Sequence, residues 1–210
     1  MLEYMASLGS DAEDSINIFD TGRYLETDSG TPLHGSLKDL GEEAYYANPF
    51  ELGWGKMVSF AHDFNGKEAL EKIANDPKTR KICTLEWNAE DILQIFAGYL
   101  DDDENLPDPF SFPYEYYFED MGNLQDKVFN ADGKLIGRSC GYEYTAYYKK
   151  CISLCTIDPE YLQEGTEVTI LWGTSGTRQF KIRAKVARFP YLDLANNREY
   201  DIDSIPRFKK

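Results

Sequence analysis

The sequence is short of histidine, of basic residues and of long apolar stretches. Its 210 residues include 2 histidines, and 22 lysines and arginines stand against 37 acidic residues, which gives a formal net charge of −15. Such a field repels a polyanion unless a local basic stripe offsets it. The basic cluster that stands out is small and terminal, Arg207, Lys209 and Lys210. We therefore expect no nucleic-acid partner.

No apolar run approaches the ~18 residues that a membrane-spanning helix needs. The first residues, MLEYMASLGSDAED, lack the basic region followed by an apolar stretch that is typical of a signal peptide. The 4 cysteines are spaced irregularly, and hydrophobic residues make up 42% of the chain, which is enough for a core without disulfides. We expect a cytoplasmic protein with reduced thiols and no membrane segment. Two histidines without an adjacent cysteine leave zinc short of ligands, so no metal site is predicted.

Two helices are predicted, over residues 66–76 and 89–99. Asn65 and Glu68 stand three residues apart in the manner of a capping box at the start of the first helix. Asn88 precedes the second helix and is expected to cap its free N–H groups. Apolar residues recur at helical spacing in both segments, so both helices are expected to be amphipathic.

Short strands dominate the remaining sequence. Residues 56–60 and 81–87 alternate in the manner of strands, and further strand-like segments follow residue 110, separated by turn signals such as Asn130-Ala-Asp-Gly. This pattern predicts a small β-barrel over roughly residues 110–192. The predicted fold class is therefore α+β. The expected divisions are an N-terminal arm at 1–21, an α+β part at 22–80, and a helix plus a β-barrel domain at 81–210.

Several stretches resemble one known family. Residues 49–70, PFELGWGKMVSFAHDFNGKEAL, resemble the segment P-x-E-x-G-x-G-W … F-x-G-[RK]-E-A-L of the glycine-cleavage T-protein (aminomethyltransferase) family. The phrases KICTLEWNAEDILQIF and DKVFNADGKLIGRS resemble, within that family, the tetrahydrofolate-dependent O-demethylases that act on vanillate and syringate. The resemblance covers roughly residues 22–192. Such proteins are about twice this long, and the chain resembles only their C-terminal half.

The resemblance implies a partial folate-binding α+β domain followed by a C-terminal β-barrel, with tetrahydrofolate as the cofactor. Glu26 stands where the family has a pterin-binding glutamate, and a carboxylate can accept two parallel hydrogen bonds from a pterin ring. His34 takes the place of a family tyrosine. Trp54 matches a position that shapes the folate cavity, and Tyr144 or Tyr147 would lie near the folate tail.

Each of these side chains also has a structural interpretation. Glu26 can be a surface glutamate at a strand end, and Trp54 can serve packing alone. Tyr144 belongs to a tyrosine-rich strand whose side chains can pack in the barrel. Cys151 and Cys155, four apart on one strand, point to one face and are expected to be small core residues.

Two hypotheses for function follow. The first is tetrahydrofolate-dependent methyl or aminomethyl transfer from a small-molecule donor, with this chain as the C-terminal half of the enzyme. The resemblance leaves the catalytic residues unknown, because the family's acid that handles N5 of the cofactor belongs to the N-terminal half. That lobe or a partner subunit would then be required. The alternative is a non-catalytic folate-binding or protein-interaction module that self-associates as a homo-oligomer, since half of a folate domain leaves apolar surface exposed.

Overall fold

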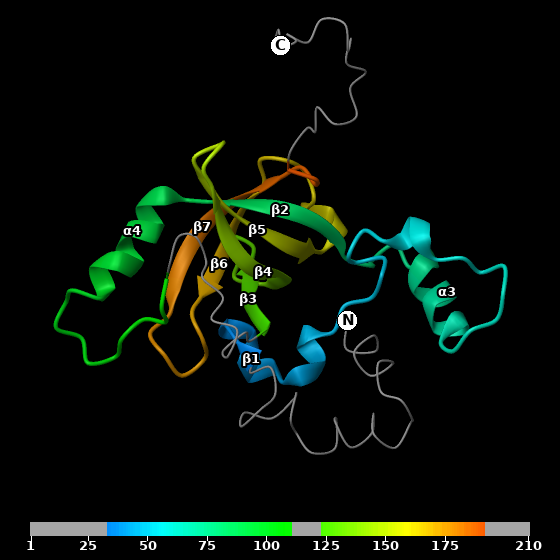
Figure 1. The fold of residues 1–210 in the computed structure, drawn as a ribbon, viewed down its shortest axis with the longest axis horizontal. Coiled ribbons are helices and arrows are strands. Elements are labelled where there is room, and N and C mark those ends of the chain that lie inside the picture. The colour runs from blue at the N-terminus through cyan, green and yellow to red at the C-terminus, as the bar shows by residue number, and fades with distance from the viewer. Residues whose placement is uncertain (1–32, 111–122, 192–210) are drawn as a thin grey trace, which may run out of the picture.

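The computed structural model describes residues 33–110 and 123–191, and a closed antiparallel barrel is its central element (Figure 1). The strands pair in the order β3-β4-β5-β2-β7-β6, and a further pairing of β3 with β6 closes the ring. The predicted α+β fold with a C-terminal β-barrel is confirmed. The barrel strands are β2 (Lys81–Trp87), β3 (Asn123–Phe129), β4 (Leu135–Thr145), β5 (Lys150–Ile157), β6 (Glu167–Trp172) and β7 (Phe180–Ala187).

The first barrel strand is β2, so the barrel begins at Lys81 and not near residue 110. The strand over residues 81–87 was predicted, but its place in the sheet was not. It pairs antiparallel with both β5 and β7, and joins these two strands in the ring. Sequence alternation indicates a strand but does not name its neighbours.

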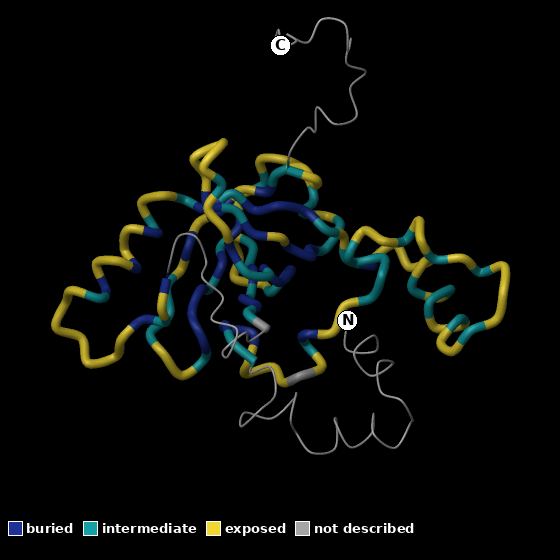
Figure 2. The backbone as a smooth tube through the Cα atoms, in the orientation of Figure 1, coloured by how far each residue is buried: buried dark blue, intermediate teal, exposed yellow. Residues whose placement is uncertain are grey.

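Inward-facing side chains fill the barrel. Along β7, Ile182, Ala184 and Val186 are buried while the basic residues that alternate with them, Lys181, Arg183 and Lys185, face solvent, as expected of a half-buried strand. Phe110 stacks on Tyr142 with ring centroids 4.3 Å apart at one end of the core. Cys151 is buried and Cys155 is fully buried, so their predicted role as core residues is confirmed. Figure 2 shows the buried backbone concentrated in the barrel.

The two predicted helices are present as α3 (Lys67–Asn75) and α4 (Ala89–Gly98). Asn88 caps α4, since its side-chain oxygen accepts a hydrogen bond from Asp91 N at 3.1 Å. The predicted cap of α3 is wrong. Gly66 is the N-cap residue, in a left-handed conformation with φ 87°, and no side chain caps the helix. A residue in that conformation turns the chain before Asn65 can reach the free N–H groups.

The segment before α3 is built from short elements. Strand β1 (Leu33–His34) pairs parallel with β3, and the short 3-10 helices η1 (Ser36–Leu40), η2 (Glu42–Tyr45) and η3 (Gly55–Met57) follow. A fourth, η4 (Pro159–Tyr161), lies between β5 and β6. The strand predicted at 56–60 is wrong, because Met57 N donates to Trp54 O at 2.8 Å and closes a turn there.

Helix α3 stands apart from the barrel. It lies to the side of the barrel in Figure 1, and none of its residues is buried. Its apolar residues Leu70 and Ile73 are only half-buried, so its amphipathic face is partly exposed. In the part of the chain that the structure describes, no helix is both long enough and apolar enough to cross a membrane.

Candidate functional site

The structure describes three of the four predicted cofactor contacts. Glu26 lies outside the described residues, as does the predicted arm at 1–21. His34 ends β1 and is half-buried, and Tyr45 Oη donates a hydrogen bond to its backbone oxygen at 2.8 Å. Trp54 precedes η3 and is 57% exposed, while Tyr144 is 39% exposed near the end of β4.

The strand register places His34 and Tyr144 toward the same end of the sheet. His34 pairs with Leu124 on β3. Gln125, which follows Leu124, pairs with Cys140 on β4. Because the two strands are antiparallel, Leu124 lies opposite a position of β4 that is past Cys140, on the side of Tyr144. These two predicted residues are therefore brought to one end of the β3–β4 pair.

Trp54 lies toward the opposite end of the sheet. A side chain on its neighbour Gly53 would meet Ile82, near the start of β2. Ile82 pairs with Thr156 on β5, several residues away from the Cys151–Tyr144 pair. The buried Arg138 holds this part of the chain to the barrel, because its guanidinium lies 3.4 Å from Glu51 and its Nε donates to Thr156 Oγ1 at 3.1 Å.

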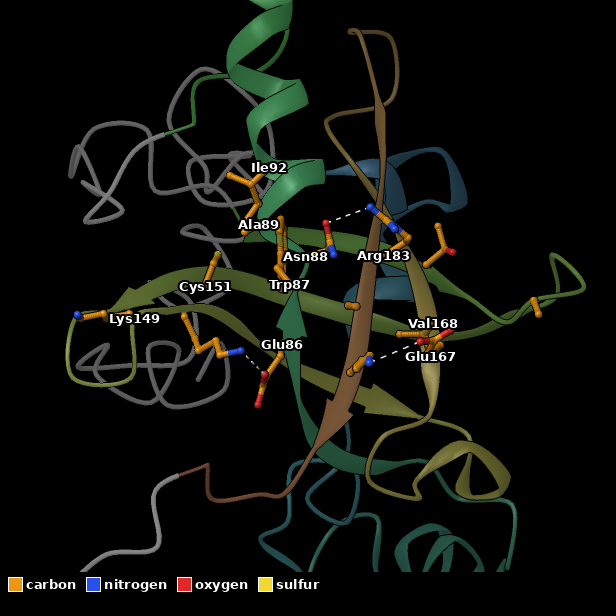
Figure 3. Close-up of a pocket in the computed structure, with 15 residues that line it drawn as sticks. Glu86, Trp87, Asn88, Ala89, Ile92, Lys149, Cys151, Glu167, Val168 and Arg183 are labelled. Atoms are coloured by element: carbon orange, nitrogen blue, oxygen red, sulfur yellow. Dashed lines mark hydrogen bonds and ion pairs between the residues drawn. The ribbon is translucent and has the colours of Figure 1, made fainter.

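A pocket of about 660 Å³ is lined by the end of β2, the start of α4, the starts of β5 and β6, and the middle of β7 (Figure 3). Cys151, one of its lining residues, pairs directly with Tyr144 in the β4–β5 ladder. The residues labelled in Figure 3 come from β2, α4, the β4–β5 turn, β5, β6 and β7. They are Glu86, Trp87, Asn88, Ala89, Ile92, Lys149, Cys151, Glu167, Val168 and Arg183.

Charged side chains of both signs line this pocket. Lys150 lies 3.2 Å from Glu86, and Lys185 lies 3.6 Å from Glu167. Such exposed pairs contribute little to stability, so their lysines can also pair with a ligand's carboxylate. Lys149 stands at the turn into β5 with φ 53°, which is uncommon for a residue other than glycine. The pocket therefore offers cations in a chain whose net charge is −15.

The buried thiols of Cys140, Cys151 and Cys155 are poor candidates for a nucleophile. The nucleophilic form of cysteine is the thiolate. Burial raises the pKa of the Cys140 thiol to about 11 and that of Cys151 to about 12, so both stay protonated near neutral pH. Burial also raises the pKa of Cys155 well above its ordinary value. Across residues 33–110 and 123–191, no group of three or more histidine, cysteine or acidic side chains could hold a metal ion.

Sequence reasoning missed the pocket lysines and one buried acid. Lys149 and Lys150 gave no signal, because a cationic turn is ordinary for a protein surface. Asp126 gave a weak one, as an acid within the strand-like segment NLQDKVF. It is 2% exposed in the structure, and buried acids of this kind are rare unless they are paired.

The chain has recognisable relatives, although no model of a known protein family matches it. It is 40% identical over 173 residues to sesamin methylene transferase from a Sinomonas species, covering 79% of this chain and 37% of that protein. It is 39% identical over 173 residues to syringate O-demethylase from a Sphingobium species, covering 78% of this chain and 36% of that protein. Aminomethyltransferase from Aquifex aeolicus is 27% identical over 168 residues, which are 80% of this chain and 36% of that protein.

Among solved structures, the glycine cleavage system aminomethyltransferase T from Bartonella henselae aligns with a TM-score of 0.41 and 17% identity, over 69% of this chain and 32% of that chain. The sequence relatives confirm the resemblance to the C-terminal half of aminomethyltransferase-family proteins and to their O-demethylase branch. The chain spans little more than a third of the length of sesamin methylene transferase and of syringate O-demethylase, 37% and 36%.

Proposed function

We propose that this chain takes part in tetrahydrofolate-dependent one-carbon transfer, as the C-terminal part of an enzyme of the aminomethyltransferase or aryl-ether O-demethylase type. The observation that carries this proposal is the identity of 40% and 39% to proteins named sesamin methylene transferase and syringate O-demethylase. Those names describe a methylene transfer and an O-demethylation. They support the enzymatic hypothesis over a non-catalytic, self-associating module.

The described side chains suit tetrahydrofolate in kind. The carboxylates of its glutamate tail can pair with Lys149 or Lys150, and an aromatic ring can stack on Tyr144. His34 lies toward the same end of the sheet. Glu26 would hold the pterin ring, and the bound cofactor would supply N5 as the acceptor of the one-carbon unit. The role of Trp54 rests on the motif alone, because it lies toward the other end of the sheet.

The chain would work together with a further lobe. In this proposal residues 22–80 are part of the folate-binding domain and residues 81–210 are the helix and barrel domain. The N-terminal lobe, in the same protein or in a partner subunit, would bind the small-molecule methyl donor and handle N5 and the leaving atom. We therefore expect no turnover by this chain alone.

Calorimetry of Glu26→Gln with tetrahydrofolate tests the pterin contact. The substitution swaps one acceptor oxygen for a donor that faces the pterin's own donors, and should cost about 1.5–3 kcal/mol of binding free energy. Glu164→Gln is the matched control, because Glu164 is exposed at the turn before β6 and should bind the cofactor like wild type. Equal affinities of wild type and Glu26→Gln would remove Glu26 from the site.

Co-expression with the N-terminal lobe of a relative tests the activity. We expect tetrahydrofolate to bind more tightly to the pair than to the chain alone, and the pair to demethylate vanillate-like ethers. An absence of cofactor binding even with the lobe supplied would contradict the proposed function and favour a non-catalytic role.

A further inference from the structure

A buried carboxylate lies where the segment carrying His34 meets the barrel. Asp126 on β3 is 2% exposed, and its Oδ1 accepts a hydrogen bond from Ser36 N at 2.9 Å. Burial raises the pKa of Asp126 to about 7, although hydrogen bonds from Ser36 and Gly173 act in the opposite direction. An acid is costly to bury, so this one is expected to be tied to the groups around it.

The residues next to Asp126 form a continuous seam of hydrogen bonds. Gly35 N donates to Thr174 Oγ1 at 3.0 Å, and Ser175 N donates to Gly35 O at 3.3 Å. Ser175 Oγ donates to Ser36 O at 3.1 Å, and Lys127 N donates to Ser36 Oγ at 2.8 Å. The backbone N–H and C=O groups of both residues after His34 are thus bonded to β3 or to the β6–β7 turn.

Two further features hold Gly35 and the β6–β7 turn in place. Gly35 has φ 87°, and a Cβ there would lie 2.1 Å from the backbone oxygen of Gln125, so no other residue fits without a shift. A second acid, Asp108, accepts a hydrogen bond from Thr174 N at 2.6 Å. Two carboxyl groups therefore hold the β6–β7 turn. Asp126 accepts a hydrogen bond from the backbone of Gly173, and Asp108 accepts one from the backbone of Thr174.

We propose that Asp126 is a positioning residue of the candidate cofactor site, which acts through Ser36 to hold His34 against the barrel. The cofactor part of this inference rests on the proposed function, because it takes His34 to face tetrahydrofolate. The seam itself rests on the hydrogen bonds alone. Asp126 contacts no cofactor; its carboxylate keeps the backbone next to His34 in one place.

Proton NMR of the histidine rings tests this inference directly, because the chain has only 2 histidines. Asp126→Asn keeps the shape of the side chain but turns one acceptor into a donor that faces the N–H groups of Ser36 and Gly173. We expect the His34 ring signal to shift or broaden and the His62 signal to stay. Amide exchange at Gly35, Ser36 and Lys127 should accelerate by roughly tenfold or more, while β2 and β7 keep their protection.

The matched control is Asp132→Asn, at the exposed β3–β4 turn, which should leave both rings and the seam amides unchanged. Thr174→Val provides a second variant if Asp126→Asn does not fold. It removes the acceptor of Gly35 N, and it should move the same His34 signal. An unchanged His34 signal, together with wild-type exchange at Gly35 and Ser36 in the folded variant, would overturn the inference. Faster exchange without any change at His34 would reduce Asp126 to a structural residue.

Adding tetrahydrofolate separates this inference from the proposed function. If Asp126 positions the site, the folded variant should bind the cofactor more weakly than wild type and Asp132→Asn should not. A wild-type His34 signal that does not respond to tetrahydrofolate, even with the N-terminal lobe present, would count against the proposed function. A His34 signal that responds to tetrahydrofolate alike in wild type and Asp126→Asn would count against the positioning role.

Discussion

At the scale of single residues, Asp126 makes stability depend on pH. Its pKa is raised from 3.8 to about 7 in the folded chain, so the protonated form is favoured by folding. Its contribution to the free energy of unfolding is therefore complete below about pH 4 and is lost as the pH rises through about 7.

We expect the stability difference between wild type and Asp126→Asn to change with pH in that window. Wild type should lose free energy of unfolding relative to the variant between pH 4 and pH 7, a range set by the raised pKa of Asp126. Urea denaturation of both proteins at several pH values measures this. A stability difference that stays constant across the window would show that Asp126 does not titrate there.

Gly35 provides a second prediction at the same scale. Gly35→Ala places a Cβ 2.1 Å from Gln125 O at φ 87°, and we expect a loss of about 2 kcal/mol or more from clash and strain together. Gly133→Ala is the control, because Gly133 has φ 77° but nothing within 4 Å of an added Cβ. The control should lose about 1 kcal/mol from strain alone. Equal urea midpoints for the two variants would argue against the close approach at Gly35.

At the scale of elements, α4 and α3 begin in different ways. Asn88 caps α4 through its side-chain oxygen, so Asn88→Ala should cost about 1 kcal/mol. Asn65→Ala is the control, since Gly66 is the N-cap residue of α3 and no side chain caps that helix. It should change stability by less than about 0.5 kcal/mol. Thermal unfolding followed by circular dichroism compares the two, and a similar loss in both variants would refute this assignment of the caps.

At the scale of the whole molecule, apolar side chains near α3 lack a cover. Met57 is 82% exposed and Trp54 is 57% exposed, and no residue of α3 is buried. Exposed apolar surface of this kind favours association. We expect the chain alone to self-associate and to bind an apolar dye, and the N-terminal lobe of a relative to suppress both effects.

Light scattering with two variants locates this surface. Met57→Gln should reduce self-association, whereas Leu100→Gln should not, although Leu100 is 88% exposed. Leu100 follows α4, which lies on the other side of the barrel from α3 (Figure 1). A monodisperse monomer that binds no dye would contradict the prediction, and an equal effect of both variants would place the association elsewhere.

The sequence by itself determined the elements that local chemistry decides. Periodicity indicated both helices and the barrel strands, and Asn88 marked the start of α4, because capping and alternation act between near neighbours in the chain. Motifs spread over the chain indicated the family resemblance, which the relatives confirm. Local reasoning failed at residues 56–60, where the chain forms the 3-10 helix Gly55–Met57, and at Asn65, where Gly66 in a left-handed conformation is the N-cap residue instead.

Only the tertiary structure decided which distant residues meet. The insertion of β2 between β5 and β7 depends on pairing across the whole barrel, and no pattern within residues 81–87 encodes it. The same holds for the seam, where Ser36 meets Asp126 across 90 positions of sequence. Only the structure also showed that His34 and Tyr144 lie toward one end of the sheet and that Trp54 lies toward the other. Burial and long-range hydrogen bonds arise only when strands close into a barrel, because closure brings together side chains that the sequence keeps apart.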